Sequence, residues 1–147
     1  MRYDEGVPMF QYLPISEHLS VLRHLKPEED RYDIFVKTAN GTTYNTYLIW
    51  AGEQFAVVDP GRASDSDAFI EELSTHADLS KLSHVIITQS QPSHSEGLKA
   101  LLDTQPELTV VASPGAMIFL KHVLNRSFKN FERSEEHTSE LQSLSHI

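Results

Sequence analysis

The order of apolar segments between residues 42 and 124 most constrains the fold of this chain. Two segments rich in β-branched and aromatic side chains are separated by a connection of hairpin length. Short apolar segments then alternate with segments of helical periodicity. This order predicts one mixed α/β domain built on a single sheet. The predicted strands are residues 42–50, 55–58, 83–88 and 109–112, and the predicted helices are residues 66–75, 96–103 and 114–124.

Local signals place the helix starts. Ser64 or Asp65 should cap the first helix, Ser95 the second, and Ser113 the third, where Pro114 occupies the favoured first position. The first 30 residues contain several prolines and no long periodic run. We therefore expect irregular structure there, with short extended pieces near residues 9–13 and 20–24.

Composition narrows the classes of function. With 39% hydrophobic and 22% charged residues, the chain has the composition of a globular domain. Its net charge of −9, without a cluster of Lys or Arg, argues against nucleic acid or an anionic membrane surface as a partner. The absence of cysteine excludes disulfides, thiolate metal sites and a cysteine nucleophile. No apolar run is long enough to span a bilayer, and the polar N-terminus shows no targeting segment.

The last 15 residues form a segment of a different character. Residues 133–143 resemble, over 11 consecutive positions, the in-frame translation of a common short-read sequencing adapter. We therefore predict a partial domain over residues 1–132 and a non-native tail over residues 133–147 that takes no part in the fold. On this interpretation the natural sequence continues past Glu132, the chain is a truncated fragment, and neither His137 nor His146 counts as a ligand.

Four segments together resemble the N-terminal metallo-β-lactamase-like domain of flavodiiron proteins. Residues 41–49 are close to the family's Gly-Thr-Thr-Tyr-Asn-x-Tyr-Leu-Ile, and residues 55–59 match a strand that ends in Asp. Residues 87–97 match its metal-binding loop, and residues 110–113 match its next strand. The photosynthetic, diflavin branch of the family is the most similar, and some of its members have neutral residues in the ligand positions.

The resemblance implies a fold and an activity. The fold would be part of an αββα sandwich, and the fragment would leave an apolar sheet face uncovered. Family members reduce oxygen or nitric oxide at a diiron centre, and the electrons arrive from FMN in a flavodoxin-like domain. They assemble as homo- or hetero-oligomers of flavodiiron subunits. The expected location is the cytoplasm or the plastid stroma.

The metal loop departs from the family pattern. Where the family has His-x-Glu-x-Asp-His, this chain has Gln89, Gln91, Ser93 and His94. Two carboxylates and one imidazole are replaced by neutral groups, which cannot balance the charge of two iron ions. We therefore expect a polar loop in which Gln89 and Gln91 bond to the backbone and to each other, with His94 as the one candidate metal ligand. No cofactor is expected to bind this fragment itself.

The other histidines are expected to be structural or solvated. His84 and His122 belong to a strand and a helix, whereas His18, His24 and His76 fall in stretches that look like loops. The Asp59-Pro60-Gly61 segment is expected to shape the turn beneath the site.

Two other functions remain open. A hydrolase of the same superfamily, such as a thioesterase or nuclease, would need a His-x-His-x-Asp-His loop, of which only His94 is present. A non-catalytic scaffold or regulatory domain of this fold needs no metal at all.

Overall fold

The computed structural model describes residues 9–32 and 35–134. The strands are β1 (Phe10–Ser16), β2 (Leu19–Lys26), β3 (Arg31–Tyr32), β4 (Val36–Lys37), β5 (Thr42–Ala51), β6 (Gln54–Val58), β7 (Leu82–Ile86), β8 (Thr109–Ala112) and β9 (Asn130–Arg133). The helices are α1 (Ser66–His76), α2 (Pro92–Ser95), α3 (Leu98–Thr104) and α4 (Pro114–Val123), with 3-10 turns η1 (Ala63–Asp65) and η2 (Leu79–Lys81). None of the helices in these ranges is long and apolar enough to cross a membrane.

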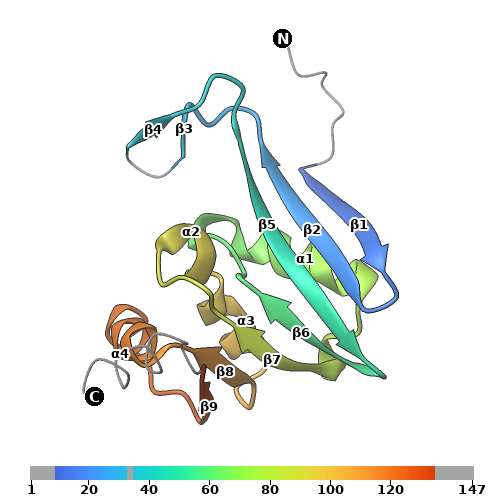
Figure 1. Ribbon diagram of the computed structural model, residues 1–147, viewed down its shortest axis with the longest axis vertical. Coiled ribbons are helices and arrows are strands. Elements are labelled where there is room, and N and C mark those ends of the chain that lie inside the picture. Colours follow the sequence, from blue (N-terminus) through green and yellow to red (C-terminus); the bar gives the residue numbers. More distant parts are fainter. Residues whose placement is uncertain (1–8, 33–34, 135–147) are drawn as a thin grey trace, which may run out of the picture.

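The main sheet has seven strands in the order β1-β2-β5-β6-β7-β8-β9, and β3 and β4 form a separate hairpin (Figure 1). The strands from β1 to β6 pair antiparallel, and those from β6 to β9 pair parallel. Right-handed crossovers between neighbouring parallel strands put α1, α3 and α4 on one face of the sheet. The predicted mixed α/β fold with a half-sandwich architecture is therefore confirmed.

The core lies between the sheet and these helices. Along β5, the buried side chains of Tyr44, Thr46 and Leu48 face the helices. They meet buried apolar side chains of α1, α3 and α4, which form one continuous cluster with those of the strands. The alternation of β5 therefore has the period of two that a half-buried strand requires.

The opposite face of the sheet carries an apolar row. Strand register aligns its members across six strands, from β1 to β8. They are Leu13, Val21, Tyr47, Val58, Ile86 and Val111. Within this row Tyr47 is 38% exposed, and its neighbour Ile49 is 41% exposed. This is the uncovered apolar face expected of half a sandwich.

The N-terminal region differs from expectation. The extended pieces predicted near residues 9–13 and 20–24 lie in β1 and β2, but the irregular structure expected around them was wrong, because β1 and β2 form a continuous hairpin. Pro14 pairs with Ser20 within this hairpin. Its missing N–H is tolerated because β1 is the edge strand, where only one side needs hydrogen bonds. The β3–β4 hairpin and β9 were not predicted.

Of the predicted helix caps, Asp65 is right in position but its side chain does not cap, and Ser95 is wrong. Asp65 is the N-cap residue of α1, but its carboxylate accepts a hydrogen bond from Lys26 instead of capping the helix. Ser95 ends the short α2, and its hydroxyl donates to the carbonyls of Ser90 and Gln91. Ser113 does cap α4, as predicted, by accepting a hydrogen bond from the Ala116 amide at 3.2 Å.

The proposed tail begins inside β9. Arg133 pairs with Ala112, and the Ser134 amide donates to the Ala112 carbonyl at 3.0 Å. Residues 135–147, with His137 and His146, lie outside the described residues. A non-native origin of residues 133–147 stays a prediction.

Candidate functional site

Asp59 lies at the carboxyl end of β6, at the edge of the sheet where open α/β folds bind ligands. It is 8% exposed and adopts a left-handed φ of 54°, a conformation that Asp tolerates better than most residues. Its backbone is held on both sides, because its amide donates to the Ile86 carbonyl and its carbonyl accepts from Thr46 Oγ1. Its Oδ1 accepts from the Thr88 amide at 2.8 Å, and its Oδ2 accepts from Thr88 Oγ1 at 2.5 Å. Asp59 thus fixes the start of the 87–97 loop through both of its carboxylate oxygens.

His94, in α2, lies against the same carboxylate. Its Nδ1 is 3.0 Å from Asp59 Oδ2, and its side chain is 26% exposed. A carboxylate only accepts hydrogen bonds, so Nδ1 donates to Asp59, and in the neutral ring Nε2 is then the acceptor. The Tyr32 hydroxyl lies 3.3 Å from Nε2 and is placed to donate to it. Both ring nitrogens of His94 therefore have partners within the protein.

The other three ligand positions of the loop do not converge on His94. The side chains of Gln89 and Gln91 are exposed and form no hydrogen bond with any described residue, so the bonds expected between them are wrong. Both glutamines precede α2, which starts at Pro92, and Gln91 is its N-cap residue without a side-chain hydrogen bond. Ser93 is buried, and its hydroxyl is 3.5 Å from the Tyr32 hydroxyl.

A diiron centre does not fit these residues. In the part of the chain that the structure describes, no three His, Asp or Glu side chains gather where they could hold a metal ion. The Asp59–His94 pair by itself would suit a ligand histidine, because such histidines usually donate their second N–H to a carboxylate. The Tyr32 hydroxyl, however, lies 3.3 Å from Nε2, the ring nitrogen that a metal would need.

Gly97 brings the loop against the Asp59 turn. Its amide donates to the Gly61 carbonyl at 2.8 Å. A Cβ at Gly97 would lie 2.3 Å from the Pro60 carbonyl oxygen, a distance that no side chain tolerates. The close approach requires glycine here and explains why the turn and the loop meet.

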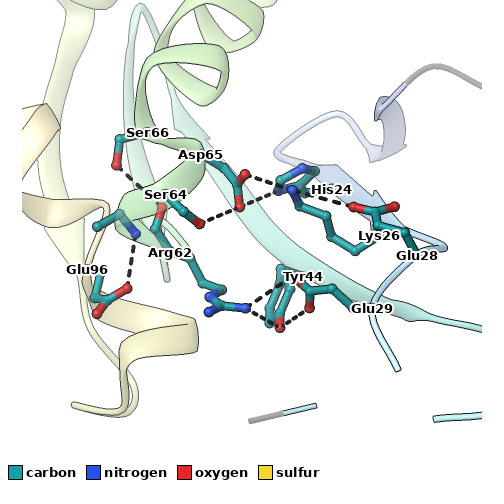
Figure 2. Close-up of polar contacts among 11 residues, drawn as sticks. His24, Lys26, Glu28, Glu29, Tyr44, Arg62, Ser64, Asp65, Ser66 and Glu96 are labelled. Carbon is teal, nitrogen blue, oxygen red and sulfur yellow. Dashed lines mark hydrogen bonds and ion pairs between the residues drawn. The ribbon is translucent and has the colours of Figure 1, made fainter. Parts of the chain in front are cut away.

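A second polar network surrounds Tyr44 beside the loop (Figure 2). The Tyr44 hydroxyl donates to Glu29 Oε2 at 2.8 Å, and Arg62 lies 3.1 Å from Glu29 Oε1 and 3.3 Å from the hydroxyl. Burial and the hydrogen bond to Glu29 raise the pKa of Tyr44 to about 12. The ring of Tyr44 also stacks on Tyr32, with centroids 5.9 Å apart. This network therefore supports the residue that covers His94.

Next to it, Asp65 faces Lys26 and His24 (Figure 2). Lys26 Nζ lies 2.7 Å from Asp65 Oδ1, and His24 Nδ1 lies 3.7 Å from Oδ2. Burial by itself would raise the pKa of Asp65, but the Lys26 hydrogen bond and the nearby charges lower it. Burial lowers the pKa of His24, and the opposing pull of Asp65 does not reverse the shift.

Two histidines therefore differ from expectation. His24 is buried in β2, not solvated in a loop. His76 ends α1, where its ring stacks on Tyr12 with centroids 4.2 Å apart. His18 is exposed in the turn between β1 and β2, as expected.

The sequence did not reveal Tyr32 as part of the site. Tyr32 and His94 are 62 positions apart, and the residues around Tyr32 show no periodic pattern. The contact between Asp59 and His94 had a better signal, because both residues follow neighbouring parallel strands whose carboxyl ends meet at one edge of the sheet.

The chain matches proteins of known families. The model described as "ODP family beta lactamase" matches residues 42–147. A Synechocystis protein named "Diflavin flavoprotein A 1" is 31% identical over 118 residues, which are 80% of this chain and 20% of that protein. A flavo-diiron protein of Clostridium acetobutylicum is 31% identical over 114 residues, which are 78% of this chain and 28% of that protein. The chain thus spans only about a fifth to a quarter of the length of these relatives.

Solved structures agree. The metal-soaked flavodiiron core of a Synechocystis protein is 28% identical with a TM-score of 0.71, covering 85% of this chain and 31% of that one. A flavo-diiron protein of Thermotoga maritima is 20% identical with a TM-score of 0.80, covering 88% and 33%, and shows the fold alone. The predicted metallo-β-lactamase-like fold is confirmed by these matches. This chain therefore belongs to the ODP family of β-lactamase-like domains, and the relatives that it matches are flavodiiron proteins.

Proposed function

We propose that the whole protein is a flavodiiron-type oxidoreductase that reduces oxygen or nitric oxide with electrons delivered through FMN, and that this domain does not hold the diiron centre. The names of its relatives support the first part, and the chemistry of the 87–97 loop supports the second. The cytoplasm or the plastid stroma is the location that we propose for the protein.

The arrangement around His94 carries the proposal. His94 is the one family ligand that the loop retains. Its Nδ1 contacts the Asp59 carboxylate, and its Nε2 contacts the Tyr32 hydroxyl. The neutral Gln89, Gln91 and Ser93 supply no charge to offset two divalent ions. Stripping water from such ions without charged ligands is unfavourable, so the folded loop should prefer its own hydrogen bonds to metal.

A domain that binds no iron could be the subunit without metal in a homo- or hetero-oligomer of flavodiiron proteins. The same observations favour a second candidate, a scaffold or regulatory domain of this fold. A hydrolase of the superfamily would need several histidines in the 87–97 loop, and His94 is the one histidine there. No group of metal-binding side chains is found elsewhere among the described residues.

Iron analysis tests the metal claim. The chain is incubated anaerobically with ferrous iron and desalted, and iron per chain is measured for the wild type and for His94→Ala. We expect no stoichiometric iron, and any traces should be the same in both proteins. Two irons per wild-type chain, lost in His94→Ala, would overturn the proposal.

A variant with Gln89→His, Gln91→Glu and Ser93→Asp serves as the matched control. It restores the family's donor types and should retain more iron than the wild type. The natural reading frame separates the two candidate functions. A flavodoxin-like domain downstream of this one supports the oxidoreductase, and its absence supports the scaffold.

A further inference from the structure

His24 holds a buried nitrogen without a partner. The residue is 7% exposed, and its ring stacks on Phe10 with centroids 4.3 Å apart. Nδ1 faces the Asp65 carboxylate, whereas Nε2 has no hydrogen-bond partner among the described residues. A buried nitrogen of this kind costs about 1–3 kcal/mol if it stays unpaired, so native structures rarely leave one empty.

His24 also lines a small cavity. The space open to the centre of a water molecule is about 10 Å³, enclosed between β2, β5, α1 and the segment after Asp59. This is close to the minimum that one water needs, and no larger ligand fits. The cavity's polar lining side chains are those of His24, Tyr44, Thr46, Arg62 and Asp65. Its polar lining residues offer the two or more partners that a buried water requires.

We propose that this cavity is a binding site for one structural water, which donates hydrogen bonds to His24 Nε2 and Thr46 Oγ1. The proton of the His24 ring then lies on Nδ1, toward Asp65, and leaves Nε2 as the acceptor. Thr46 Oγ1 already donates to the Asp59 carbonyl at 2.8 Å and retains lone pairs that can accept.

The water joins the side chains of His24 and Thr46, for which no direct hydrogen bond is found in the described structure, although their strands pair through the backbone. On one side is His24 of β2, whose neighbours are Asp65 and Lys26. On the other side, through Thr46, is the backbone of Asp59, the residue that holds His94. The water is thus a bridge that supports the Asp59 turn from within the core.

A crystal structure of the full chain that resolves ordered waters tests the proposal. The wild type should show a density peak about 2.7–3.2 Å from His24 Nε2 and within the same reach of Thr46 Oγ1. His24→Phe keeps the ring stack on Phe10 but has no acceptor, and it should lose the peak. An empty cavity, or a protein group bonded to Nε2, would overturn the proposal.

Oxygen-17 relaxation dispersion gives the same answer in solution. The wild type should hold one more long-lived water than His24→Phe. Equal numbers in two folded proteins would contradict the bridge. If the variant does not fold, the density in the wild-type crystal decides, because it requires no substitution.

Discussion

His94 Nδ1 lies 3.0 Å from Asp59 Oδ2, although the two residues are 35 positions apart. The pair forms because β6 and β7 are parallel neighbours whose carboxyl ends meet at one edge of the sheet. Asp59 binds Thr88 through both carboxylate oxygens as well. One buried carboxylate therefore fixes both the start of the loop and the ring that would face a metal.

Asp59→Asn should destabilise the fold by about 1–3 kcal/mol. The Asp59 carboxylate accepts hydrogen bonds from Thr88 and His94, and an amide has only one oxygen, so at least one of these donors loses its acceptor. Asn tolerates the left-handed backbone at this position, so the change isolates the loss of the carboxylate. The free energy of unfolding is measured by urea denaturation at pH 7.5. Asp30→Asn, at an exposed position, is the control and should leave the midpoint unchanged. Equal midpoints for the two variants would contradict the role given to Asp59.

Gly97→Ala should disrupt the contact between the loop and the Asp59 turn. The added Cβ meets backbone of Pro60 at 2.3 Å, so one of the two segments must move. We expect a loss of at least about 2 kcal/mol, as for other severe overpacking. Gly115→Ala is matched to it, because nothing lies within 4 Å of a Cβ at Gly115, in α4. That variant should be neutral or more stable, by up to about 1 kcal/mol. Similar losses in both variants would show that the close approach at Gly97 does not matter.

Acid should destabilise the protein through His24. Burial lowers the pKa of His24 below its ordinary value of 6.5, and the nearby positive charge of Lys26 lowers it further. The negative charges of Asp65, Glu29 and Glu28 raise it but do not reverse the shift. Below pH 6.5 the unfolded chain then binds more protons than the folded one, so stability falls as pH drops through this window. Urea midpoints at pH 7.5 and 5.5 should differ more in the wild type than in His24→Phe. An unchanged difference would mean that His24 is not the group responsible.

The uncovered sheet face should make the chain prone to association. Tyr47 and Ile49 point away from the helices and are partly exposed, so Tyr47→Thr with Ile49→Thr should reduce binding of an apolar dye and slow aggregation. Both replacements are β-branched, which suits a strand. Leu48→Ala, on the buried face of the same strand, should instead cost about 2–5 kcal/mol. If the double variant aggregates as fast as the wild type, another surface is responsible.

Much of the fold between residues 42 and 124 could be predicted from the sequence. The apolar periodicity there is strong, and β8 matches its predicted residues 109–112. The β1–β2 hairpin was missed because Pro14 interrupts the pattern of apolar and polar residues typical of a strand. At an edge strand such as β1, the hydrogen bond that proline cannot donate is not needed. Asp65 occupies the N-cap position of α1, but its carboxylate is taken by Lys26, a partner 39 positions away. Ser95 was misjudged as a cap because its hydroxyl bonds to carbonyls that precede it in the same loop.

The site was only partly predictable. The ligand positions of the loop could be read directly, because they follow a strand whose end faces the site. Tyr32 could not, since its contact with His94 depends on the β3–β4 hairpin, which has no signature in the sequence. The wrong expectation for Gln89 and Gln91 has a simple cause, because exposed amides can bond to water and need no partner in the protein.

The most direct test of the central claim follows His94 itself, because the chain has eight histidines and a bulk metal count does not say which of them binds. Nitrogen-15 spectra of histidine-labelled protein are recorded during titration with zinc, for the wild type and for Tyr32→Phe, which uncovers Nε2. The account predicts that the His94 signals of the wild type stay in place at stoichiometric zinc, and that any response appears only in Tyr32→Phe. A stoichiometric shift of both His94 nitrogens in the wild type would show that His94 is a metal ligand and contradict the account.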